Sequence, residues 1–166
     1  MDNTCIITKS SNIFIYFYYY LYFNFNIYFL NKIMTEEFKQ ISTTNGFMKH
    51  NGGILFRTIS ENEYEFKTKI NENHLNTAKI THGGFIAALV DSGVGTAAHR
   101  SANGGRPCVT ISLELKFIAS VKLGQELIGL VKVQRKTKSL VFLTCELSAD
   151  NKIAATASGI WKIIKK

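Results

Sequence analysis

Two spacings of apolar residues predict two kinds of element in this chain. Apolar and polar residues alternate, as in strands with one buried face, over six segments: 54–58, 64–70, 109–117, 127–135, 140–148 and 153–164. Between the second and third segments, Gly83 to about Ser101 is apolar almost all round and predicts a long helix enclosed by other structure. Thr35–Lys49 predicts a short amphipathic helix. The pattern therefore predicts an α+β fold, in which an antiparallel sheet of five or six strands wraps round one long central helix.

The predicted central helix contains residue types that helices normally avoid. Asp91 places a carboxylate in its apolar middle, where burial is costly unless the group has partners or a chemical task. Gly93 and Gly95 each cost about 1 kcal/mol of helix propensity relative to alanine, so packing must compensate. At the helix start, Gly83-Gly84 exposes backbone N–H groups that no helix carbonyl can bind. A helix start that can hold an oxyanion, near a buried carboxylate, is a candidate site for acyl chemistry.

Composition and charge limit the classes of partner. The 166 residues are enough for one domain, and the net charge of +8 gives a basic surface. No run of lysine and arginine has the width of a nucleic-acid footprint, so no nucleic-acid partner is expected. Arg135, Lys136 and Lys138 form a basic cluster in a turn, which is either solvated or a site for a phosphate-bearing small molecule. The three cysteines are far apart and predict neither a disulfide framework nor a metal site, and no cofactor is expected.

Residues 1–33 differ in composition from the rest of the chain. The segment 13–30 contains six of the seven tyrosines, and every residue from 13 to 33 can be encoded by A and T alone. A helix over 13–30 would be about 27 Å long, marginally enough to span a bilayer. Three interpretations stay open: sequence upstream of a true start at Met34, a membrane or targeting segment, or neither. We therefore divide the chain into an aromatic tract, 1–33, and a folded domain, 34–166, with membrane contact only if the tract is real.

Residues 74–91 carry a spaced motif. His74-Leu75-Asn76 is followed, six residues after the asparagine, by His82-Gly83-Gly84, and Asp91 lies eight residues after Gly83. With the strand 109–117 and the turn Lys122-Leu123-Gly124, this spacing resembles the hotdog-fold acyl-CoA thioesterases of the phenylacetic-acid-degradation type. The resemblance covers about residues 40–165. It implies a hotdog fold for the folded domain and hydrolysis of acyl-CoA, of medium or long chain, to a free acid and coenzyme A.

The resemblance also implies roles for individual residues. Asn76 would hold the thioester or the attacking water, and the Gly83 N–H would polarise the thioester carbonyl. Asp91 would act as general base or nucleophile from the neighbouring subunit. Thr110 stands where the family has a serine that helps to place the water. Simple alternation puts Thr110 on the polar face of its strand, so a solvated threonine is a close alternative.

Further candidates concern substrate binding. His82 and Gly84 lie beside the implied reacting centre, although His82 is also expected to bond backbone at the helix start. The basic cluster of Arg135, Lys136 and Lys138 is the candidate for the phosphates of coenzyme A. The chain departs from the family pattern at Lys79, where a glycine is common, and also at Ser112 and Ser120-Val121. These departures leave the acyl preference open.

Three functions compete at this stage: an acyl-CoA thioesterase, a non-catalytic acyl-CoA binding module, and a hotdog enoyl-CoA hydratase or dehydratase. A thioester has a thiol leaving group, with a pKa near 8.5, so one base and one oxyanion site can suffice without a Ser-His-Asp triad. The presence of Asn76, Gly83 and Asp91 together favours the thioesterase. The resemblance further implies a homo-oligomer, either a dimer or a tetramer, and leaves cytoplasm and mitochondrion open as compartments.

Overall fold

The structure is a computed structural model that describes residues 36–102 and 105–165. Its elements, in chain order, are β1 (Lys39–Gln40), α2 (Phe47–His50), β2 (Leu55–Thr58), β3 (Glu63–Lys69), the 3₁₀ turn η1 (Glu72–His74), α3 (Gly83–Ser101), β4 (Cys108–Phe117), β5 (Glu126–Lys136), β6 (Leu140–Ala149) and β7 (Lys152–Ile163). The aromatic tract lies outside the described residues. Among those that are described, no helix has the length and apolar character that a bilayer span needs.

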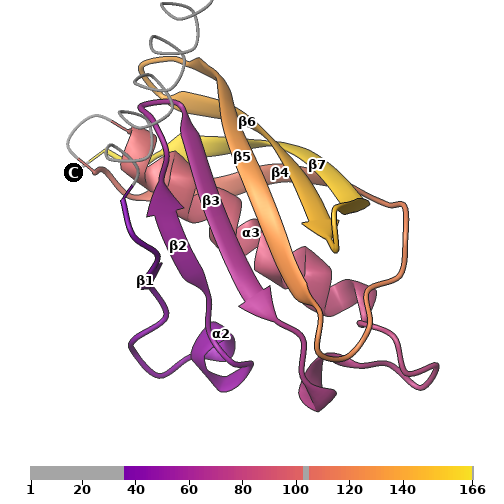
Figure 1. Cartoon of the computed structure of the whole chain (residues 1–166). Coiled ribbons are helices and arrows are strands. Elements are labelled where there is room, and N and C mark those ends of the chain that lie inside the picture. The colour runs from indigo at the N-terminus through magenta and orange to yellow at the C-terminus, as the bar shows by residue number, and fades with distance from the viewer. Residues whose placement is uncertain (1–35, 103–104, 166) are drawn as a thin grey trace, which may run out of the picture. The chain divides into compact units, whose positions relative to one another are not determined.

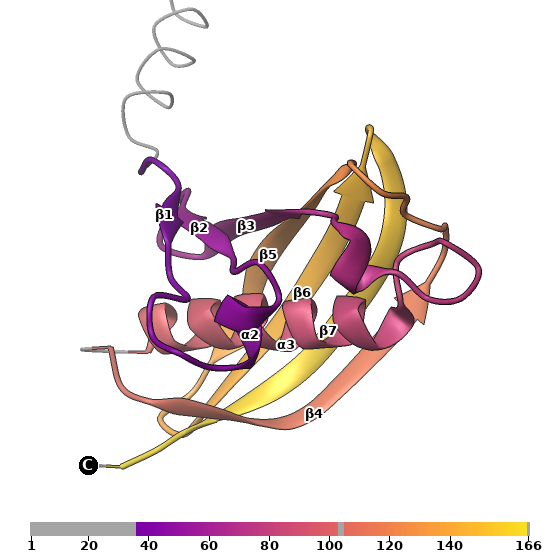
Figure 2. The same cartoon turned by 90° about the horizontal axis from the view of Figure 1, so that it is seen from below.

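The strands form one antiparallel sheet that curves around α3. Its order is β1-β2-β3-β5-β6-β7-β4, so β1 and β4 are the two edges. Figures 1 and 2 show α3 lying along the inner side of the sheet. The helix turns Leu89, Val90 and Ala97 into the core, where they are fully buried. This arrangement confirms the predicted hotdog fold. The six strands expected from alternation are all present, and β1 adds a two-residue edge strand.

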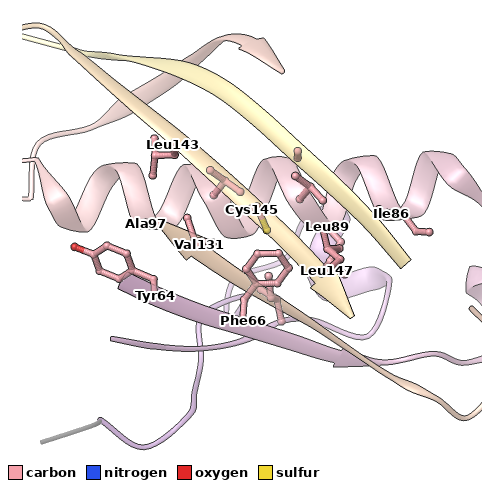
Figure 3. Close-up of a cluster of buried hydrophobic side chains, with 14 of the residues drawn as sticks. Tyr64, Phe66, Ile86, Leu89, Ala97, Val131, Leu143, Cys145 and Leu147 are labelled. Atoms are coloured by element: carbon pink, nitrogen blue, oxygen red, sulfur yellow. The ribbon is translucent and has the colours of Figure 1, made fainter. Parts of the chain in front are cut away.

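Two glycines make room for an aromatic ring at the centre of the core. Phe66 of β3 is fully buried, and it lies in the cluster of apolar side chains drawn in Figure 3. A Cβ on Gly93 of α3, or on Gly129 of β5, would overlap the Phe66 ring. The packing expected to compensate for Gly93 is therefore present. A Cβ on Gly95, two residues further along α3, would meet only Trp161, with 3.4 Å to Nε1.

The amphipathic helix expected over Thr35–Lys49 is wrong. Lys39 and Gln40 pair with β2, and only the four residues of α2 are helical. The segment before α2 is rich in β-branched residues and ends in Asn45-Gly46, types with low helix propensity. Phe38 instead lies against cations of the neighbouring strands, with its ring centroid 4.5 Å from Cζ of Arg57 and 4.6 Å from Nζ of Lys67.

The two helix glycines give a matched stability test. We expect Gly93→Ala to lower the free energy of unfolding by about 1–2 kcal/mol, because overpacking a core costs about 1–3 kcal/mol and alanine regains up to about 1 kcal/mol of helix propensity. Gly95→Ala should leave stability unchanged or raise it by up to about 1 kcal/mol. Urea unfolding of the two variants measures both values. Equal stabilities would contradict the proposed packing of Phe66.

Candidate active site

The start of α3 leaves one backbone donor available. His82 is the N-cap, and its Nδ1 accepts a hydrogen bond from the Gly84 N–H at 2.9 Å. The Gly84 donor is therefore occupied, and His82 bonds backbone at the helix start as expected. No hydrogen bond from the Gly83 N–H is found among the described residues. The ring of Phe117 lies close by, 3.3 Å from where a Cβ on Gly83 would be. Gly83 thus presents an unpaired N–H beside an apolar ring.

His74 fixes the loop that leads into this helix start. Its ring is fully buried and stacks on Phe85 of α3, with 3.7 Å between the ring centroids. Its Nδ1 accepts from the Asn71 N–H at 3.2 Å, and its Nε2 lies 2.8 Å from the carbonyl oxygen of Asn51. The backbone of His74 also accepts the His82 N–H at 2.7 Å. His74 belongs to the spaced motif without a predicted role, and the structure shows that it positions the loop.

Asn76 organises the same loop through its side-chain oxygen. The Oδ1 atom accepts from the Ala78 N–H at 2.9 Å and from the Ile80 N–H at 3.3 Å. The resulting turn places Lys79 in the left-handed region, at φ 59°. Glycine adopts that region without strain, whereas a lysine there is strained. Because Oδ1 is occupied, the amide Nδ2 is the part of Asn76 that can still bind a substrate or water.

Asp91 and Thr110 are brought together by a β-bulge. The register of β4 against β7 shifts between Thr110 and Ser112, where Ile111 is the extra residue. A bulge resets the alternation of side chains and commonly re-aims a residue beside a functional site. Thr110 therefore pairs with the buried Trp161, on the helix side of the sheet, and its hydroxyl donates to Asp91 Oδ1 at 2.7 Å. The expectation that Thr110 lies on the outer polar face is wrong for this reason.

The expectation that Asp91 is buried is also wrong for the single chain. Leu89 and Val90 point into the core, but Asp91 lies on the opposite side of α3 and is exposed. It lines a cavity of about 720 Å³ between α3, the start of β4 and the segment 41–49. Apolar side chains of Met48, Val109 and Trp161 contribute to its walls. The segment 41–49 forms a wall that the sequence does not predict, because its residue pattern predicts a helix.

A cysteine also lines this cavity. Cys108 lies at the start of β4, two residues from Thr110. Partial burial raises the pKa of its thiol, and this outweighs the opposing effect of Arg106. A thiol with a raised pKa is a poor nucleophile near neutral pH. Asp91 is therefore the better candidate for the reacting group in this cavity.

Gly83 and Asp91 are too far apart on α3 to act on the same bond. They are eight residues apart on one straight helix, which separates them by about 12 Å at 1.5 Å per residue. A general base and an oxyanion donor must both lie within hydrogen-bond distance of one reacting centre. The candidate residues of one chain therefore form two separate groups, with Gly83 and Asn76 at the helix start and Asp91 with Thr110 two turns later.

The basic residues at the end of β5 do not form a single cluster. A second register shift lies between Val133 and Arg135; beyond it Arg135 pairs with Phe142 and Lys136 pairs with the buried Val141. Lys136 reaches the last turn of α3, where its Nζ donates to the Ser101 carbonyl at 2.9 Å. Neighbouring residues of a strand point to opposite faces. The three cations thus have three different surroundings, and Lys138 lies in the turn before β6.

Comparison with known proteins supports the motif-based resemblance. Residues 78–155 match the family model described as Thioesterase superfamily. Human acyl-coenzyme A thioesterase 13 is 24% identical over 119 residues, which cover 72% of this chain and 84% of that protein. The structure of zebrafish thioesterase superfamily member 2 matches with a TM-score of 0.67 at 22% identity, over 74% of this chain and 90% of the other. The PaaI protein from the phenylacetic acid degradation operon of E. coli matches with a TM-score of 0.66 at 19% identity, over 73% and 86%.

The loop bonds of Asn76 can be tested separately from its chemistry. Asn76→Ala should lower the free energy of unfolding by about 1 kcal/mol, because two backbone N–H groups lose their acceptor. Asn76→Asp keeps an oxygen at the same place and should have nearly the same free energy of unfolding as the unmodified protein. Urea denaturation compares the two. If Asn76→Asp lowers the free energy of unfolding as much as Asn76→Ala does, the described loop geometry is contradicted.

Proposed function

We propose that this chain, whose residues 78–155 match the family model described as Thioesterase superfamily, is an acyl-CoA thioesterase whose reacting base is Asp91. The observation that carries this proposal is the 2.7 Å hydrogen bond from Thr110 to Asp91 Oδ1, on the wall of a cavity large enough for a substrate. The bond fixes the carboxylate and leaves Oδ2 to accept a proton. Thr110 is thus a positioning residue, and its hydroxyl can also contact the attacking water.

The reaction then needs two protein contributions. Asp91 takes a proton from water as the water oxygen attacks the thioester carbonyl carbon, and the carbonyl electrons move onto its oxygen. The Gly83 N–H donates to that oxyanion, and one such donor is typically worth about 10²–10³ in turnover. The C–S bond breaks as the carbonyl re-forms, and coenzyme A leaves as a thiolate. Asn76 Nδ2 is placed to hold the thioester or the water.

The two halves of the site meet only if two chains associate. We infer a homodimer in which Asp91 of one chain faces Gly83 of the other. The outer edge of β4 has no strand partner among the described residues, and it carries exposed apolar side chains, including Val109 and Ile111. An edge strand of this length with apolar residues favours pairing with another chain. Further association into a tetramer is compatible with the same arrangement.

Medium- and long-chain acyl groups are the proposed substrates. The cavity beside Asp91 includes several apolar side chains, and Phe47 and Val109 are largely exposed in the single chain. Each methylene group buried on such a surface contributes about 0.8 kcal/mol to binding. KM should therefore fall as the acyl chain lengthens from four to about twelve carbons. Release of free thiol from a series of saturated acyl-CoA esters measures this.

Replacing Asp91 tests the mechanism. Asp91→Asn should remain folded, because the side chain is exposed and the amide keeps an acceptor for Thr110. Its turnover of acyl-CoA should fall by at least about 10²-fold, since the general base is lost. Glu61→Gln, an exposed carboxylate in the turn before β3, is the control and should keep full activity. Activity of Asp91→Asn equal to that of the control would contradict the role of Asp91.

Assays on the unmodified protein distinguish the thioesterase from the two competing functions. An acyl-CoA binding module would bind acyl-CoA without releasing thiol. A hydratase would convert an enoyl-CoA to its hydroxyacyl-CoA with the thioester intact. Either result with the unmodified protein would replace the thioesterase proposal.

A further inference from the structure

A second cavity, away from Asp91, is lined by four cations. Arg106, Lys138, Lys162 and Lys165 surround a space of about 620 Å³, which Ser139, Ile163 and Ile164 complete. None of the described residues that line it is acidic. We call it the basic cavity. Of the three residues that formed the expected basic cluster, only Lys138 belongs to it.

The cations come from three segments that the backbone holds together. The Ile163 N–H donates to the Ser139 carbonyl, and the Ile164 N–H donates to the Pro107 carbonyl, both at 2.8 Å. These bonds join the end of β7 to the turn before β6 and to the segment before β4. The backbone positions of the basic cavity are therefore set before any ligand binds, which lowers the entropy cost of binding.

Within the described part of the chain, no carboxylate forms an ion pair with the cations of the basic cavity. The Nε of Arg106 is buried and has no hydrogen-bond partner. An unsatisfied donor on a buried part of a cationic side chain is costly, and like charges around one space repel. A bound anion would offset the repulsion among the four cations.

We propose that the basic cavity binds a ligand through two or more clustered phosphate groups. Four cations around one bounded space exceed what a single carboxylate can neutralise, and arginine and lysine are the usual partners of phosphate oxygens. Coenzyme A presents such phosphates, and its identification as the ligand rests on the proposed function. Arg106 is four residues from Thr110, at most about 13 Å of extended chain, so the long pantetheine arm could join the two cavities. A free phosphorylated ligand is the other source of the same chemistry.

Binding of small phosphates tests the site without any catalysis. Inorganic pyrophosphate and adenosine 3′,5′-bisphosphate are titrated calorimetrically into the unmodified protein, the double variant Lys138→Gln/Lys162→Gln, and Lys152→Gln. Lys152 is a matched control, because it is an exposed lysine at the opposite end of β7 from Lys162. The double variant should bind at least about tenfold more weakly, since two charge-assisted contacts are lost. Lys152→Gln should bind as the unmodified protein does.

Kinetics then distinguish the two sources of phosphate. If coenzyme A occupies the basic cavity, the double variant should show a KM for acyl-CoA raised about tenfold with kcat unchanged, while hydrolysis of the N-acetylcysteamine thioester, which lacks phosphates, stays the same. If pyrophosphate binding is lost but KM for acyl-CoA is unchanged, the ligand is a free phosphorylated molecule. The proposal is overturned if the unmodified protein binds neither phosphate, or if the double variant binds as well as Lys152→Gln. If the protein hydrolyses no thioester, only the proposed function is contradicted. The calorimetric titration still tests whether the basic cavity binds phosphates.

Discussion

The distance along α3 between Gly83 and Asp91 is the constraint on which the proposed reaction depends. A helix is rigid over two turns, so the oxyanion donor and the carboxylate of one chain stay about 12 Å apart. No local movement can bring them to one thioester without unwinding a helix whose inner face is fully buried. The chemistry proposed for this chain therefore requires a second copy. The exposed edge of β4, next to Thr110, is the surface on which that copy would complete the site.

The start and the middle of α3 have different surroundings. At its start, the buried His74 and the Oδ1 of Asn76 hold a loop that leaves the Gly83 N–H unpaired. In its middle, the β4 bulge turns the Thr110 hydroxyl toward Asp91. In the single chain, apolar residues do not enclose the Asp91 carboxylate. The Asp91 side chain is oriented by the hydrogen bond from Thr110, and the second chain of the proposed dimer would shield it from bulk water.

The sequence predicted those features that depend on local periodicity. Alternation identified six strands, and the apolar run identified α3 together with the placement of Asp91 on it. It could not show the bulges at Ile111 and near Arg135, because one inserted residue leaves composition and spacing almost unchanged while it reverses every side chain beyond it. The bulge at Ile111 is why alternation predicts the wrong face for Thr110. Lys136 does not join the expected cluster because β5 runs on to Lys136, so that Arg135 and Lys136 point to opposite faces. The helix predicted over residues 35–49 is also wrong, because the pairing of Lys39 and Gln40 with β2 overrides a weak helical spacing of apolar residues.

Subunit complementation tests the shared site most directly. Gly83→Pro removes the backbone donor and keeps the helix start, since proline is tolerated at a first helical position and His82 already has the extended conformation it requires. The Phe117 ring, 3.3 Å from a Cβ at this position, must shift slightly to admit the proline. Gly83→Pro and Asp91→Asn should each be inactive alone. When the two are co-expressed and assort randomly, half of the dimers are mixed and each mixed dimer has one intact site, so about a quarter of the unmodified activity should return. If each chain held a complete site, every chain in the mixture would be defective, and no recovery of thioester hydrolysis would contradict the account.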